Sequence, residues 1–341
     1  MLRRSKGGRV TVVIACLSLT SVTIAGQSSR PAPTTSQSNT GLVRTPDGKP
    51  DLQGVWNFAN ITPLERPARF AGKEFLTDAE VAALEAAAAA NRVDREPRPG
   101  DPGNYNQFWM DGGTKVAGNR RTSLIVDPAD GKLPPYTAEG EKRRADRAAI
   151  ARRLPTGPED LAIDERCLVG FNAGPPMMPG AYNNYVQIVQ HADYVVILNE
   201  MVHDARIIPL DGRPYGSVRQ WMGTSRGRWE GDTLVVETKN FRPEGTAHNA
   251  NVGDRLEAID GNLHLIERFT RVDSDTLKYE FTITDPTAFT RPWTVSYPMT
   301  RSQDQMYEYA CHEGNYSMAG MLSGARAQEK AATETKKTGA R

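Results

Sequence analysis

The chain of 341 residues carries 42 basic and 41 acidic side chains and three cysteines. A nearly neutral chain without a basic stripe argues against a nucleic-acid partner, because Lys and Arg contacts with phosphates supply most of the affinity for nucleic acids. Beyond the amino-terminal segment, no stretch approaches the roughly 20 apolar residues that a membrane-spanning helix needs, so we expect no stable membrane span once that segment is removed.

Residues 1–25 have the pattern of a cleavable secretory signal peptide. A basic start precedes an apolar run, which ends with small side chains at Thr23 and Ala25, the −3 and −1 positions of a cleavage site. The run is short and interrupted by Ser and Thr, so a retained anchor or a lipid on Cys16 is less favoured. Cleavage leaves 38 basic and 41 acidic residues, a net charge of −3, and places the protein in the periplasm or outside the cell.

Two cysteines remain after cleavage, Cys167 and Cys311. In an oxidising compartment, an even pair far apart in sequence is most simply a disulfide. Two separate buried thiols are the alternative. The sequence contains no CxxC, so neither a zinc ribbon nor a thioredoxin-like redox motif is indicated.

The rest of the chain divides into a leader, one domain and a tail. Residues 26–44 begin with a run rich in Ser, Thr, Pro and Gln and are expected to be a flexible leader. Residues 45–326 are expected to form a single domain with a helical insertion at about 60–180, followed by a charged tail at 327–341. Helices are predicted at 77–93 and 137–153. Each starts at a Thr, and Thr77 with Glu80 makes a capping box.

The second half of the chain has the alternation of β-strands. With two earlier strands, the predicted strands are residues 54–56, 122–126, 185–191, 194–200, 205–210, 227–229, 233–238, 263–272, 277–285, 293–300 and 305–311. The connections are short, and a meander of that size tends to close on itself. A last helix is expected to begin at a Ser317 cap. We therefore predict a mainly β fold, an antiparallel meander forming a calycin-like barrel with a helical insertion and a C-terminal helix.

Two resemblances support this architecture. Gly54-Val55-Trp56 in the first strand, followed by a meander and a helix, resembles the lipocalin or broader calycin architecture. The motifs PDLQGVW at 50–56, HDARIIPLDGRP at 203–214, SRGRWEGDTL at 225–234 and YEYACHEGNY at 307–316 resemble a large group of secreted bacterial proteins. The second resemblance implies export and carries no mechanism.

His203 and His312 are the candidate catalytic residues. Each lies at the end of a predicted strand next to an acid, Asp204 for His203 and Glu313 for His312, and strand ends at a barrel mouth are where small-molecule sites form. A His oriented by a carboxylate serves as a general base or a metal ligand, with Glu200 or Glu313 as the acid. A hydrogen-bonded His at a turn is the alternative. Glu200 and His203 fall on opposite faces of a strand and there is no HExxH, so we expect no metal and no cofactor.

Glu267 shares a strand face with apolar neighbours, so we expect it to point into the barrel. A buried carboxylate needs a partner, and Arg206, Arg226 and Arg228 are the candidates. A structural ion pair is one interpretation, and a polar anchor for a ligand is the other. The strand aromatics are more often core residues, but Trp221 is kept as a ligand contact. The full set of predicted ligand-binding residues is Glu267, Arg206, Arg226, Trp221, Asn315 and Tyr316.

Three functions remain open at this stage. The favoured one is a periplasmic or secreted barrel that binds an apolar or aromatic small molecule. The alternative is an acid–base or metal-dependent enzyme (a hydrolase, lyase or isomerase) that uses His203 and His312 at the barrel mouth. The third is a structural envelope protein without a ligand.

Overall fold

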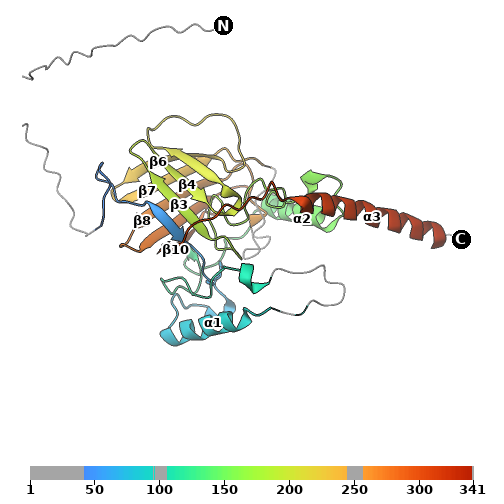
Figure 1. The fold of residues 1–341 in the computed structure, drawn as a ribbon, viewed down its shortest axis with the longest axis horizontal. Helices are drawn as coiled ribbons and strands as arrows, with labels where there is room; N and C mark the ends of the chain where they lie inside the picture. Colours follow the sequence, from blue (N-terminus) through green and yellow to red (C-terminus); the bar gives the residue numbers. More distant parts are fainter. Residues whose placement is uncertain (1–41, 95, 97–105, 244–255, 340–341) are drawn as a thin grey trace, which may run out of the picture. The chain divides into compact units, whose positions relative to one another are not determined.

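The computed structural model describes residues 42–94, 96, 106–243 and 256–339 (Figure 1). The predicted signal peptide and all but the last residues of the predicted leader lie outside this part of the chain. The leader ends sooner than expected: Arg44 makes an isolated β-bridge with Pro50 and donates two hydrogen bonds to Asp232, at 2.9 and 2.8 Å. Folded structure therefore already includes residue 44.

Within the described residues, ten antiparallel strands form one sheet. They are β1 (Gly54–Asn57), β2 (Ile125–Asp127), β3 (Tyr185–Gln190), β4 (Tyr194–Asn199), β5 (Ala205–Pro209), β6 (Thr224–Glu230), β7 (Thr233–Lys239), β8 (His264–Arg271), β9 (Thr276–Thr284) and β10 (Trp293–Ser302). In most of these strands, buried residues alternate with more exposed ones, and β9 shows the pattern most clearly. In β9, Leu277, Tyr279, Phe281 and Ile283 are fully buried, while the residues between them are polar and more exposed. The mainly β, antiparallel prediction is confirmed.

The strand order is β5-β4-β3-β1-β10-β9-β8-β7-β6, with β2 paired to the start of β10. Strand β1 lies between β3 and β10, so it joins the two halves of the meander. Every pair of strands that would be neighbours in a closed meander is therefore hydrogen-bonded except β5 and β6, among the strands that the structure describes. The sheet is not closed into a barrel, and the calycin-like barrel stays a prediction.

Strands β5 and β6 nevertheless approach each other at this break. A Cβ atom at Gly227 of β6 would lie 2.9 Å from Cγ2 of Ile208 in β5 and 2.6 Å from Cδ2 of Leu210. Only a residue without a side chain fits at that distance. We call the line between β5 and β6 the seam. Residues of β5 and β6 pack against each other across the seam, although no backbone hydrogen-bond ladder links the two strands within the described chain.

The segment between β1 and β3 contains both predicted insertion helices, α1 (Asp78–Asn91) and α2 (Ala138–Arg152). Thr77 caps α1, and the capping box with Glu80 is present: Thr77 N donates to Glu80 Oε2 at 2.8 Å, and Glu80 N donates to Thr77 Oγ1. Thr137 caps α2 without a capping box: its Oγ1 accepts a hydrogen bond from Gly140 N at 3.0 Å. Both helix predictions are confirmed to within two residues at each end.

The carboxyl-terminal segment differs from the prediction in three ways. Residues 305–311 are not a strand. Strand β10, which precedes these residues, already has β9 and β1 beside it, so they cannot pair with it. The final helix, α3 (Tyr316–Gly339), is capped by Asn315, whose Oδ1 accepts from Met318 N at 3.2 Å, and not by Ser317. The helix also continues through residues 327–339, which were expected to be a tail. No helix in the described residues is long and apolar enough to cross a membrane.

The interior of the sheet is filled by side chains. Trp56, Phe269, Tyr279 and Tyr297 are fully buried, and Met177 from the insertion is buried among the same core residues. Met177 N donates to Tyr279 Oη at 3.1 Å, and Tyr297 Oη donates to Met177 O at 2.9 Å. Met177 of the insertion thus fills the interior of the sheet, which leaves the end of the sheet and the seam as places for a site.

Candidate functional site

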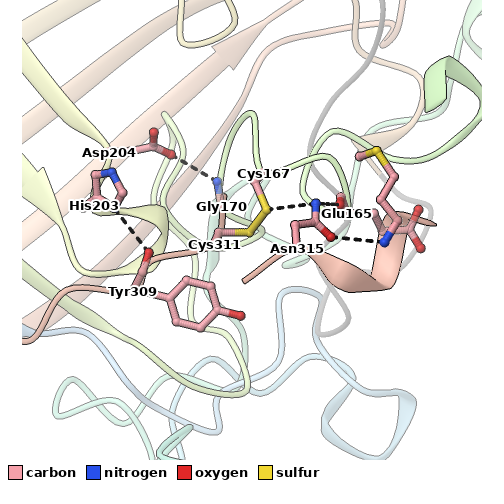
Figure 2. The surroundings of a disulfide bond; sticks show 9 residues. Glu165, Cys167, Gly170, His203, Asp204, Tyr309, Cys311 and Asn315 are labelled. Carbon is pink, nitrogen blue, oxygen red and sulfur yellow. Dashed lines mark hydrogen bonds between the residues drawn. A yellow bond between two sulfur atoms is a disulfide. The ribbon is translucent and has the colours of Figure 1, made fainter. Parts of the chain in front are cut away.

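A disulfide joins Cys167 in the insertion to Cys311 in the segment after β10, with a Cα–Cα distance of 5.6 Å (Figure 2). The predicted bridge is confirmed. Beneath it lies a small second cluster of buried residues, Ala173, Met201 and Val202. The bridge therefore holds the end of β4, the insertion and the approach to α3 together in one region of the molecule.

The backbone around His203 is unusual. His203 ends the short 3-10 turn Met201–His203 between β4 and β5, with φ values of 60° at Val202 and 45° at His203. A positive φ is costly for a β-branched residue such as Val. Cys167 and Asn183, in the same region, also have φ values of 56° and 55°. Backbone strain of this kind concentrates at functional sites, and here the buried cluster and the disulfide hold it.

Asp204 follows directly and is partly buried. Its Oδ2 accepts a hydrogen bond from Gly170 N at 3.1 Å (Figure 2). The approach requires glycine, because a Cβ at residue 170 would lie 2.2 Å from Cγ of Met201. Burial raises the pKa of Asp204 to about 6, although the Gly170 N–H and the neighbouring histidines favour the ionised carboxylate. A carboxyl with that pKa exchanges protons near neutral pH.

The structure brings His203 and His312 into one region, because both act electrostatically on Asp204. His203 Nδ1 lies 3.3 Å from the carbonyl oxygen of Tyr309 (Figure 2). It also lies 3.9 Å from a carboxylate oxygen of Glu308. His312 and the predicted acid Glu313 are both exposed. His312 lies in a turn and not at a strand end, since the predicted strand before it does not form.

Glu200 takes a different environment from the one predicted. It is buried, its Oε2 has no hydrogen-bond partner within the described residues, and burial followed by the charge of Asp111 raises its pKa. Asn183 hydrogen-bonds to it. No hydrogen bond or ion pair in the described part of the chain joins the Glu200 side chain to His203 or His312. The acid within ion-pair distance of His203 is Glu308, and Asp204 interacts with both histidines through their charge.

Glu267 points into the sheet interior and pairs with Arg206. Both guanidinium Nη atoms contact the carboxylate, at 2.5 and 2.9 Å, and Tyr279 Oη donates to the same carboxylate at 2.7 Å. Burial and the charge of Glu267 raise the pKa of Tyr279 well above its usual range. Every partner of this carboxylate is part of the fold, so the geometry matches the structural ion pair. The other interpretation, a ligand anchor, stays a prediction without a contact to support it.

An apolar cleft lies where the insertion meets the ends of the strands. Its cavity volume is about 70 Å³, and it is partly open to solvent. Insertion residues form one wall, and Trp221 with residues that lie after β7 and before β8 forms the other. Its main apolar lining residues are Ile163, Val169, Phe171, Pro175, Pro176, Met178, Trp221, Phe241, Leu256, Ile259 and Leu263. Gly170, which holds Asp204, also lines this cleft, so the acid lies directly behind its wall.

A second cleft, the seam cleft, runs along the break between β5 and β6. It is lined by residues of β5, of β6 and of the segment that connects them. Arg206, Arg219, Arg226 and Arg242 all line it, and none of its lining residues is acidic. Trp221 and Arg242 belong to both clefts, and the Arg242 guanidinium lies 4.6 Å from the centre of a Trp221 ring. The two clefts are therefore contiguous at Trp221.

The predicted ligand residues are thus divided. Trp221, Arg206 and Arg226 line a cleft. Asn315 is committed to the fold: besides capping α3, its Nδ2 donates to Glu165 O at 3.0 Å and contacts Cys167 Sγ at 3.3 Å (Figure 2). Tyr316 is 83% exposed and lines neither cleft. A ligand role for Asn315 and Tyr316 stays a prediction.

Sequence reasoning missed Arg219 and Arg242, and it named Asp204 only as the acid next to His203. Asp204 carries a usable signal, because it follows His203 directly at the start of a strand. Arg219 and Arg242 carry none, since their relation to Trp221 depends on how β6 and β7 are placed. Across the described residues, no group of three His, Cys, Asp or Glu side chains is arranged to hold a metal ion.

A scan against protein-family models finds no match for the chain, and a search of curated proteins finds no match either. The resemblance to secreted bacterial proteins and to calycins therefore stays a prediction. The function has to be argued from the geometry of the clefts and of the histidine region.

Proposed function

We propose that this protein binds an apolar or aromatic small molecule in the apolar cleft, in the periplasm or outside the cell. The observation that carries the proposal is an apolar cleft with Trp221 on its wall, at the end of a sheet whose interior is filled. Small-molecule sites are typically concave and apolar, with a few polar groups at the edge, and Arg242 and Asp260 supply such groups here. The filled interior of the sheet supports this position, because it leaves no room for a ligand there.

The test uses N-phenyl-1-naphthylamine, an uncharged aromatic probe whose fluorescence rises in apolar surroundings. We expect saturable binding to the mature protein and at least about a tenfold weaker affinity in Trp221→Ala, because a buried aromatic contact of this size accounts for more than 1 kcal/mol. Trp109→Ala is the matched control, since Trp109 is 62% exposed and lines neither cleft. Binding that is absent, or equal in both variants, would refute the proposal.

A second candidate function is acid–base catalysis at His203, Asp204 and His312. One observation favours it: the Asp204 carboxyl, with a pKa of about 6, follows His203 directly and responds to the charge of His312, next to a backbone held at positive φ. The group can accept and release a proton at neutral pH, as hydrolysis, elimination or isomerisation requires.

Turnover of p-nitrophenyl esters by the purified protein tests this second function for hydrolysis. His203→Gln and His312→Gln are expected to abolish turnover while leaving folding and probe affinity unchanged. The control is His191→Gln, because His191 is exposed and stacks on Tyr194 away from Asp204. Turnover that survives in both histidine variants would exclude them as the catalytic groups.

A further inference from the structure

We propose that the molecule bound in the apolar cleft carries an anionic group, and that the arginines of the seam cleft hold this group. The inference rests on the proposed function and adds the chemical class of the ligand: an organic anion with an apolar or aromatic body. Three observations carry it, namely the charge of the seam cleft, its continuity with the apolar cleft and a buried donor without an acceptor.

The first observation is a positive charge that the cleft lining does not neutralise. Glu267 balances Arg206, but the hydrogen-bond partners of Arg219 and Arg226 within the described residues are backbone carbonyls. Arg219 Nη1 donates to Phe241 O at 2.9 Å and Gly261 O at 2.7 Å. Arg226 donates to the carbonyls of residues 213, 214 and 225 at 2.8–3.0 Å. Carbonyl dipoles fix the position of a guanidinium without cancelling its charge, and each guanidinium keeps further N–H groups for an anion.

The second observation is the continuity of the two clefts. Trp221 lines both, so a molecule packed against its ring reaches from the apolar wall toward the arginines. Guanidinium groups already surround this ring, with Arg242 at 4.6 Å and Arg166 at 5.7 Å from its centre. Cations over the face of an indole are favourable, and they add to the positive potential at the junction. An apolar body and an anionic head would therefore meet complementary surfaces at adjacent positions.

The third observation is Arg206 Nε. This nitrogen is buried and has no hydrogen-bond partner among the described residues, although Arg206 lines the seam cleft and its side chain is only 3% exposed. A buried donor that lacks an acceptor costs free energy. An anion seated in the seam would bring an acceptor to the side of the guanidinium that Glu267 does not occupy. The fork of an arginine suits a carboxylate, sulfate or sulfonate of this kind.

The experiment compares two probes that differ by one group. N-phenyl-1-naphthylamine is uncharged, and 8-anilinonaphthalene-1-sulfonate is the same skeleton bearing a sulfonate. We expect the sulfonate to bind wild-type protein at least about tenfold more tightly, as charge-assisted hydrogen bonds predict, and this preference to weaken as salt is raised. In Arg219→Gln with Arg226→Gln, the preference should fall to near unity while the uncharged probe binds as before.

Arg228→Gln is the matched control. Arg228 lies two residues from Arg226 on the same strand, but it pairs with Glu230 and lines neither cleft. It should keep the wild-type preference. Arg219→Lys with Arg226→Lys retains the charge and should keep part of the preference, which separates loss of charge from loss of fold. Thermal unfolding of each variant checks that the domain is intact.

The outcomes distinguish the two proposals. If neither probe binds, the proposed function fails and this inference fails with it. If both probes bind with equal affinity, the apolar site stands and the anion site is refuted. The anion site is also refuted if the glutamine pair keeps the preference for the sulfonate, or if the Arg228 control loses it.

Discussion

Arg206 of β5 and Glu267 of β8 face each other across the interior of the sheet, with both carboxylate oxygens held by the two Nη atoms of the guanidinium. Strand β5 is one edge of the hydrogen-bonded order, and β8 is two strands from the other edge. The pair therefore connects the two ends of the sheet that no ladder joins. Burial lowers the pKa of the guanidinium, but Glu267 outweighs this and holds the pKa of Arg206 above its ordinary value.

The first prediction concerns this pair. Glu267→Gln leaves a buried guanidinium without a counter-charge, and we expect it to lower the free energy of unfolding by about 3–5 kcal/mol. Urea unfolding of the wild-type and variant proteins measures the loss. Arg206→Met combined with Glu267→Leu removes both charges, and this double variant should cost less than Glu267→Gln alone. A double variant that is less stable than the single would show that the pair stabilises the fold beyond compensating its own burial.

The second prediction concerns the seam. Gly227→Ala places a Cβ less than 3 Å from Ile208 of β5 and from Leu210, which follows β5, so β5 and β6 must move apart or the side chains must shift. We expect a loss of about 1–3 kcal/mol, the usual cost of overpacking, measured by urea unfolding. Gly216→Ala is the control, because a Cβ there meets nothing within 4 Å. An unchanged stability in Gly227→Ala would mean that β5 and β6 do not pack against each other in solution.

Local patterns were enough to find most elements. Thr77 and Thr137 mark the starts of α1 and α2, because an N-cap is a property of neighbouring residues. Alternation located β9 and its neighbours for the same reason. Pairing between distant segments could not be predicted from local patterns. Residues 305–311 alternate as a strand does, but β1, from the other end of the chain, already pairs with the end of β10.

The site shows the same division. The pairing of Cys167 with Cys311 could be predicted because only two cysteines remain after the signal peptide is removed. The inward direction of Glu267 could be predicted from the apolar residues on the same strand face. That Arg206 is its partner depends on how far the sheet curves, and three arginines fitted equally well. The filling of the interior by Met177 was also hidden, because a Met in a Pro-rich loop has no local signal for where it inserts.

The third prediction concerns the disulfide. Cys167 and Cys311 are separated by 144 residues, and a cross-link closing so long a loop stabilises by about 4–5 kcal/mol when loop entropy dominates. We expect Cys167→Ala with Cys311→Ala to lower the free energy of unfolding by up to that amount, measured by urea unfolding. Wild-type protein kept reduced should lose a similar amount. A stability that is the same with and without reductant would contradict the bridge.

The fourth prediction concerns Asp204 and pH. Burial raises the pKa of this carboxyl from 3.8 to about 6 in the folded protein. Below about pH 4 it is protonated in the folded and the unfolded chain alike, and its burial carries no charge penalty. As the pH rises from 4 through 6, the unfolded chain ionises first, so the folded state loses stability relative to it.

Asp204→Asn removes this titration and retains an oxygen that can accept from Gly170 N. A shift of about two pKa units corresponds to about 3 kcal/mol, which partial exposure reduces to about 1–3 kcal/mol. We therefore expect the variant to be more stable than wild type by that amount at pH 7.5, and the difference to shrink toward zero at pH 4. The measurement compares the variant with wild type at each pH, because burial also raises the pKa of Glu200 and this contribution is present in both proteins. A difference that does not change between pH 4 and pH 7.5 would show that Asp204 has an ordinary pKa, and the observation that favours acid–base chemistry at His203 and His312 would be lost.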